Sequence, residues 1–203
     1  MPIEKHVQSM YTIHEMQKRK LIILGGASAV GKTTTGRKLQ LALGRPAHNM
    51  DMDWHVDFLL PNRKSFFKAS TEEYIVQCFL VEKFLCEALG KRMFNENENP
   101  LIASSAHIIP GFIRTDTKID PRIDTHQILL TTNEDELYER LHKRTIERDR
   151  RQHMHDNFEA NADKTIKFQR LLIDIAKTRG VQSIENDEHA IKNIIESVGL
   201  GNA

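Results

Sequence analysis

The sequence predicts an α/β fold in which a parallel sheet is covered by helices on both faces. Short apolar segments alternate with longer amphipathic ones along the chain. The apolar segments are nearly continuous rather than alternating with polar residues, which is typical of parallel strands buried on both faces. A glycine-rich loop also separates the first apolar segment from a helical one, as in nucleotide-binding α/β proteins.

The apolar segments and their flanking turn residues locate the strands. We expect strands at residues 21–24, 47–50, 101–105, 127–131 and 181–184. Residues 55–69 show no clean period and are expected to form an irregular connection.

Capping residues locate the helices. Gly44 and Pro46 should end a helix that begins at Thr34. A capping box at Ser70 and Glu73 predicts a helix to about Leu89. Similar signals predict helices at 134–151 (Asn133 with Glu136), 162–179 (closed by Gly180) and from the Asp187 cap to Val198.

Length and composition predict one domain. The chain has 203 residues, and we assign residues 19–203 to a single domain and residues 1–18 to an N-terminal arm or extra helix. Its 29 basic and 28 acidic residues give no overall excess of positive charge, so nucleic acid is not expected as a partner. Two cysteines without metal-site spacing, and no signal or membrane segment, favour a cytoplasmic protein. Oligomeric state is left open.

The loop after the first strand carries the strongest motif. Gly26, Gly31, Lys32 and Thr33 fit the Walker A spacing, and a strand precedes the loop while a helix follows it. The fold prediction therefore narrows to a P-loop NTPase with a nucleoside-kinase-like sheet. We assign ATP phosphates to the loop and the helix N-terminus, and Mg²⁺ to Thr33. The predicted nucleotide-binding residues are Gly26, Ala27, Ser28, Ala29, Val30, Gly31, Lys32, Thr33 and Thr34.

The acid of the site is expected from the end of the second strand. The strand at 101–105 ends in Ser104 and Ser105, where many NTPases carry an acid. Strand alternation places Asp51 and Asp53 on one face. We predict that Asp51 organises Mg²⁺ through water and that Asp53 contacts the acceptor hydroxyl as a catalytic residue. The alternative is that both merely cap the next turn or helix.

Positive charge is expected from the helix at 134–151. Four arginines recur there at helical spacing: Arg140, Arg144, Arg148 and Arg151. They predict a lid that closes over ATP, with Arg144 and Arg148 catalytic and Arg151 on the nucleotide. The alternative is a solvated face balanced by acidic neighbours.

His107 and Arg114 follow the third strand and are predicted to contact an anionic small-molecule acceptor. The histidines show no zinc-site spacing.

Three stretches resemble 2-phosphoglycerate kinase and its relatives among P-loop small-molecule kinases. They are LIILGGASAVGKTT, SSAHIIPGFI and RDRRQHMHDNFEANADKTIKFQRLLIDIAKTRGVQSIEN. The resemblance implies transfer of the γ-phosphate of ATP, with Mg²⁺, to a hydroxyl group. It assigns Lys32 and Thr33 to nucleotide and metal, Asp51 or Asp53 to the acceptor region, His107 to the substrate, and the arginines at 144–151 to the lid. Ser104 and Ser105 depart from the family pattern, which has Glu-Gly there.

Two other functions remain open on the sequence. The same cradle and lid would serve a kinase that acts on a nucleotide, a nucleotide sugar or a nucleic-acid end. A non-catalytic ATP-binding regulatory module would explain the serines at the end of the third strand. The sequence lacks the Asn-Lys-x-Asp guanine reader of a GTPase.

Overall fold

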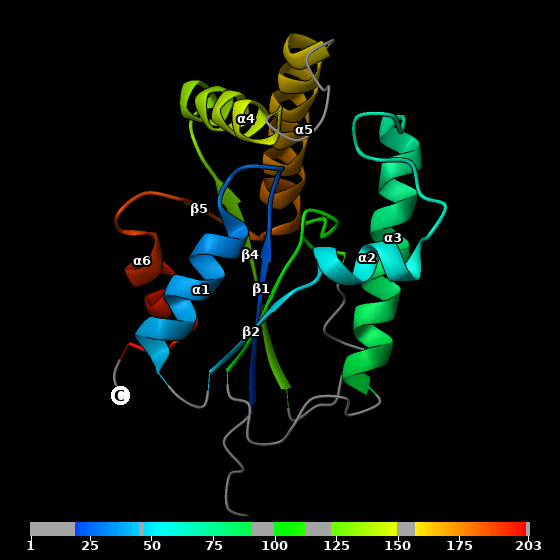
Figure 1. Cartoon of the computed structure of the whole chain (residues 1–203). Helices are drawn as coiled ribbons and strands as arrows, with labels where there is room; N and C mark the ends of the chain where they lie inside the picture. Colours follow the sequence, from blue (N-terminus) through cyan, green and yellow to red (C-terminus); the bar gives the residue numbers. More distant parts are fainter. Residues whose placement is uncertain (1–18, 45–46, 91–99, 113–122, 150–156, 202–203) are drawn as a thin grey trace, which may run out of the picture.

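A computed structural model describes residues 19–44, 47–90, 100–112, 123–149 and 157–201 (Figure 1). Five strands form one sheet in the order β2-β3-β1-β4-β5, and every neighbouring pair is parallel. The sheet confirms the predicted fold class. The strands are β1 (Arg19–Gly25), β2 (His48–Asp51), β3 (Leu101–Ser104), β4 (Ile123–Thr131) and β5 (Gln182–Glu185).

Helices cover both faces of this sheet. Two of them, α1 (Lys32–Leu43) and α6 (Ala190–Ser197), pack together on one side, and α3 (Thr71–Gly90) and α5 (Phe158–Arg179) lie on the other (Figure 1). Two further helices, α2 (Asp53–Leu59) and α4 (Glu134–Asp149), start just after the carboxyl ends of β2 and β4. None of the helices in the described ranges is both long and apolar enough to span a membrane.

The central strand β1 shows why both faces need cover. Leu21 and Ile23 are buried on one face, in a cluster with Leu85 of α3. Ile22 and Leu24 are buried on the other face, in a cluster with Leu39 of α1. Because successive strand residues point to opposite faces, a strand that is apolar throughout must be buried twice.

The predicted caps are confirmed at two helices. At the start of α3, the Glu73 carboxylate accepts from the Ser70 N–H at 2.9 Å, and the Ser70 hydroxyl accepts from the Glu73 N–H at 3.2 Å. At α4, the Asn133 side chain accepts from the Glu136 N–H at 2.8 Å. Gly180 ends α5 in the left-handed conformation, with φ 67° and ψ 24°.

Three predictions about element boundaries are wrong. Residues 53–59 form α2, where an irregular connection was expected to begin at residue 55. Strand β4 starts at Ile123 instead of residue 127. Its polar first residues can belong to the strand because the Asp124 carboxylate pairs with Lys20 of β1 at 3.1 Å. Helix α5 starts at Phe158, four residues before the prediction. The arm or helix predicted for 1–18 lies outside the described residues.

Candidate functional site

The site is built on the loop between β1 and α1. Gly26 has φ 145°, and a Cβ there would lie 2.5 Å from the Leu130 carbonyl oxygen of β4. Gly31 has φ 96°, again a conformation that favours glycine. Ala29 adopts φ 67° although it has a Cβ, a strain of about 1–2 kcal/mol. The loop therefore keeps its shape only because its surroundings hold it.

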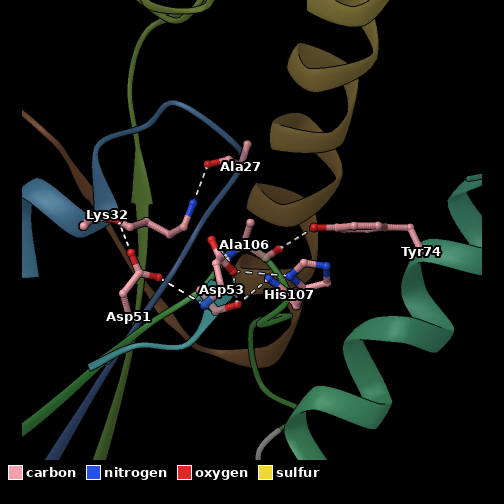
Figure 2. Close-up of polar contacts among 9 residues, drawn as sticks. Ala27, Lys32, Asp51, Asp53, Tyr74, Ala106 and His107 are labelled. Atoms are coloured by element: carbon pink, nitrogen blue, oxygen red, sulfur yellow. Dashed lines mark hydrogen bonds and ion pairs between the residues drawn. The ribbon is translucent and has the colours of Figure 1, made fainter. Parts of the chain in front are cut away.

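Lys32 is folded into this loop. Its side chain is buried, with 7% of the residue exposed, and Nζ donates to the Ala27 carbonyl at 2.8 Å (Figure 2). Burial lowers the pKa of Lys32 to about 8, opposed by the negative charges of Asp53 and Asp51 and reinforced by Arg144. An anion bound in the loop would favour the charged ammonium group.

Thr33 and Asp51 lie together beside the loop. The Thr33 hydroxyl donates to Asp51 Oδ2 at 2.8 Å, which joins the first residues of α1 to the end of β2. The other oxygen, Oδ1, accepts from the Asp53 N–H at 3.1 Å. Asp51 thus accepts from the first N–H of α2 with one oxygen, as the capping alternative expects, and from Thr33 with the other. Its role toward Mg²⁺ stays a prediction.

Asp53 is held by the segment that follows β3. Its Oδ1 accepts from the Ser105 hydroxyl at 2.6 Å, from the Ala106 N–H at 3.0 Å and lies 3.4 Å from His107 Nδ1 (Figure 2). Burial alone raises the pKa of Asp53, but the hydrogen bonds from His107 and Ser105 and the charge of Lys32 outweigh it. The pKa consequently lies well below its usual range, and the carboxylate is ionised at neutral pH.

The strand-alternation argument for Asp51 and Asp53 is wrong in its reason. Asp51 is the last residue of β2, whereas Asp53 is the first residue of α2. The two carboxylates still lie close together beside Lys32, because the Asp53 N–H donates to Asp51 Oδ1 (Figure 2). Ser105 follows β3, where many NTPases carry an acidic residue, and its hydroxyl instead donates to the Asp53 carboxylate.

His107 is a buried part of this network. Only 5% of the residue is exposed, and its ring lies 5.0 Å from that of Tyr74 in α3. The Tyr74 hydroxyl donates to the Ala106 carbonyl at 3.1 Å. Within the described part of the chain, His107 Nε2 has no hydrogen-bond partner. Helix α3 therefore fixes the segment that holds Asp53.

Two of the predicted arginines lie against the phosphate loop. Arg144 Nη1 donates to the Ser28 hydroxyl at 3.4 Å, and Arg140 Nη1 donates to the Val30 carbonyl at 3.1 Å. The helix α4 places this arginine face beside the loop. Arg114 and Arg151 lie outside the described residues, as does the side chain of Arg148, which belongs to α4.

Sequence reasoning missed Asn186, which follows β5. Its side-chain Nδ2 donates to the Val30 carbonyl at 2.6 Å, and Oδ1 accepts from the Thr35 hydroxyl at 2.9 Å. The available signal was its position: it directly follows a strand, and the carboxyl ends of parallel strands meet at the edge where the loop lies.

Comparison with known proteins identifies the fold. No protein-family model matches the chain, and no curated protein matches it. Among solved structures, it is similar to a gluconokinase from Sinorhizobium meliloti (12% identity, TM-score 0.52, covering 90% of this chain and 93% of that one). It is also similar to a shikimate kinase from Acinetobacter baumannii in complex with shikimate (14% identity, TM-score 0.52, covering 91% of this chain and 93% of that one). A shikimate kinase from Aquifex aeolicus is similar as well (17% identity, TM-score 0.50, covering 88% of this chain and 96% of that one). The chain has the α/β P-loop fold of these small-molecule kinases.

Proposed function

We propose that this protein is an ATP-dependent kinase that transfers the γ-phosphate to a hydroxyl group of a small metabolite. One observation carries the proposal: Asp53, held by Ser105, Ala106 and His107, lies beside Lys32 of the phosphate loop (Figure 2). The charge of Lys32 helps to keep the pKa of Asp53 low and its carboxylate ionised. A phosphoryl transfer needs this juxtaposition of a phosphate-binding cation with a group that orients the acceptor. The similarity to gluconokinase and shikimate kinases supports it.

The phosphate side of the site would be formed by residues 26–34. Their glycine conformations and the N-terminus of α1 present backbone N–H groups to an anion, and Lys32 would contact the β- and γ-phosphates. The Thr33 and Asp51 oxygens, 2.8 Å apart, fit Mg²⁺, which prefers oxygen ligands and keeps several waters. Mg²⁺ would neutralise phosphate charge there.

Asp53 would orient the acceptor hydroxyl. A carboxylate with a strongly lowered pKa is a weak base, so it would accept a hydrogen bond and polarise the hydroxyl before taking its proton during transfer. Ser105, Ala106 and His107 would keep the carboxylate in place. His107 and Arg114 are proposed as acceptor-binding residues.

The arginines of α4 would supply charge stabilisation. Arg144 already contacts Ser28 of the loop, and Arg148 and Arg151 would join it when ATP binds. Guanidinium groups suit phosphate oxygens because they donate two parallel hydrogen bonds.

The acceptor class is proposed from the sequence resemblance. The three stretches similar to 2-phosphoglycerate kinase favour a small anionic hydroxy compound. Of the two serines that stand where that family has Glu-Gly, Ser105 donates to Asp53 and so lies at the proposed acceptor side. We therefore expect an acceptor that differs from 2-phosphoglycerate while the transfer chemistry is retained.

The test is ADP release from MgATP, measured alone and then with a panel of hydroxy acids, phosphorylated acids, sugars and nucleosides. Release that depends on an anionic metabolite supports the proposal. Release that depends on a nucleoside, nucleotide sugar or oligonucleotide end would favour the second kinase class. Tight MgATP binding without acceptor-dependent release over the whole panel would favour a regulatory module.

A further inference from the structure

The outer side of the phosphate loop is held by contacts that the Walker motif does not contain. The carbonyl of Val30 points away from the cradle and accepts two hydrogen bonds, from Asn186 Nδ2 at 2.6 Å and from Arg140 Nη1 at 3.1 Å. Val30 is completely buried. A buried carbonyl that lost these donors would be unsatisfied, and the loop would turn it toward water.

Asn186 joins four separate parts of the chain at this point. Its Oδ1 accepts from Thr35, the fourth residue of α1, at 2.9 Å. Its backbone N–H donates to the Thr131 carbonyl at the end of β4, at 2.8 Å. Its backbone carbonyl accepts from Arg140 of α4, at 3.5 Å. The side-chain amide therefore has a fixed orientation, with the donor on the loop and the acceptor on α1.

The loop next to Asn186 needs such support. Ala29 has φ 67° and Gly31 has φ 96° on either side of Val30. A Cβ at Gly31 would lie 2.3 Å from Asn186 Nδ2, so the loop and the amide are in close contact. Backbone in this conformation persists only where its neighbours determine it. The Val30 carbonyl is the point at which Asn186 and Arg140 can do so.

We propose that Asn186 is a positioning residue of the phosphate site, which holds the Val30 carbonyl outward so that the loop's N–H groups face the phosphates. The inference rests on the proposed function only in taking the loop as a phosphate-binding site. Asn186 would act through the loop and not by contact with the nucleoside, so its effect should be the same for any ligand that binds through phosphates.

Calorimetry with two ligands tests this on the full-length protein. The Asn186→Ala variant should bind Mg²⁺-ADP and Mg²⁺-tripolyphosphate each about 10-fold more weakly than the wild type, a loss comparable with one or two buried hydrogen bonds. Asn186→Asp keeps the acceptor for Thr35 but cannot donate to Val30, and should lose at least as much. Asn193→Ala, at an exposed position of α6, is the matched control and should bind both ligands normally.

Equal losses for both ligands support a positioning role. Loss for ADP alone would mean that Asn186 touches the nucleoside, and unchanged binding of both would mean that it does nothing for the loop; either result overturns the inference. If Asn186→Ala does not fold, Thr35→Val can be used instead, because it removes one hydrogen-bond partner of the Asn186 amide. This variant should bind both ligands about threefold more weakly. Unchanged binding of both ligands would overturn the inference. Wild-type protein that binds neither ligand would refute the proposed function instead.

Discussion

The site has two halves that are built in different ways. After the proposed function, we call the loop at 26–33 the phosphate half and Asp53 with residues 105–107 and Tyr74 the acceptor half. The phosphate half uses backbone groups of one continuous segment, whose shape requires glycine at stated positions. The acceptor half uses side chains from α2, α3 and the segment after β3, which only the fold brings together. The proposed phosphate binding thus depends on a local motif, whereas the proposed acceptor side depends on tertiary contacts.

The halves also differ in how completely their polar groups are paired. Among the described residues, the buried side-chain atoms without a hydrogen-bond partner belong to β2, α3, β3 and the segment after β3. They are Asn49 Oδ1, Gln77 Oε1, Glu82 Oε1, Ser104 Oγ and His107 Nε2. The loop's own Val30 carbonyl has two donors. Of the unpaired atoms, His107 Nε2 belongs to the acceptor half, which therefore offers one buried nitrogen for a new hydrogen bond.

The largest expected effect separates the two halves at Asp53. Asp53→Asn removes the charge that orients the acceptor, so turnover should fall by about 10²–10⁴-fold, the usual contribution of a general base. Affinity for Mg²⁺-ADP should change far less than turnover, because Asp53 is not part of the loop and acts on it only through its charge, which raises the pKa of Lys32. Steady-state kinetics and calorimetry measure the two effects. Asp163→Asn on the surface of α5 is the control. Full turnover in Asp53→Asn would remove Asp53 from the mechanism.

A change at Gly31 should affect the phosphate half directly. Gly31→Ala places a Cβ 2.3 Å from Asn186 Nδ2 at φ 96°, so Mg²⁺-ADP binding should weaken by at least about tenfold and unfolding should become easier by about 1–3 kcal/mol. Gly180→Ala is the control: its φ is 67° and no atom lies within 4 Å, so only stability should fall, by about 1 kcal/mol. Calorimetry and thermal unfolding provide the readouts. Equal ADP affinity in both variants would contradict the account of the loop.

The buried Glu82 of α3, which lies outside both halves, should make the stability of the protein depend on pH. Burial raises its pKa from 4.5 to about 8, partly offset by a hydrogen bond from the Ile109 N–H. Between pH 4.5 and 8 the unfolded chain loses this proton while the folded chain keeps it, so the free energy of unfolding falls as pH rises.

Glu82→Gln removes this dependence. The stability of the wild type relative to Glu82→Gln should fall by about 2 kcal/mol between pH 5 and 8, a value below the full linkage because an ionised carboxylate can shift toward water. Urea unfolding at several pH values measures it. A constant difference over that range would show that Glu82 does not titrate there.

The smallest effect is expected at Tyr74. Tyr74→Phe keeps the ring beside His107 and removes the hydroxyl that donates to the Ala106 carbonyl. The free energy of unfolding should fall by about 1 kcal/mol. The KM for the acceptor should rise a few-fold with little change in the KM for ATP. A rise in the KM for ATP without a rise in the KM for the acceptor would show that Tyr74 supports the phosphate half, against this prediction.

The sequence predicted those parts of the fold that depend on local signals. The Walker spacing, the apolar strands and the Ser70–Glu73 and Asn133–Glu136 caps depend on residues near one another in the chain, and each of them is present. Helix α2 was missed because none of its residues offers a side-chain cap; Asp51, two residues before it, accepts from its first N–H.

The acceptor half could be predicted only in part. Asp51 and Asp53 could be proposed because of their place at the end of the second strand, but the partners of Asp53 at 105–107 lie more than fifty residues away in the chain. No spacing rule predicts such a contact. Asn186 was missed for the same reason: its link to Val30 joins residues 156 positions apart.

Phosphorus NMR of a reaction with MgATP and the acceptor that stimulates ADP release tests the central claim most directly. The account predicts that a phosphomonoester resonance of the acceptor grows as the γ-phosphate of ATP disappears, in equal amounts, and that Asp53→Asn abolishes this growth while still binding Mg²⁺-ADP. Conversion of the γ-phosphate to inorganic phosphate alone, or no consumption of ATP with any acceptor, would contradict it.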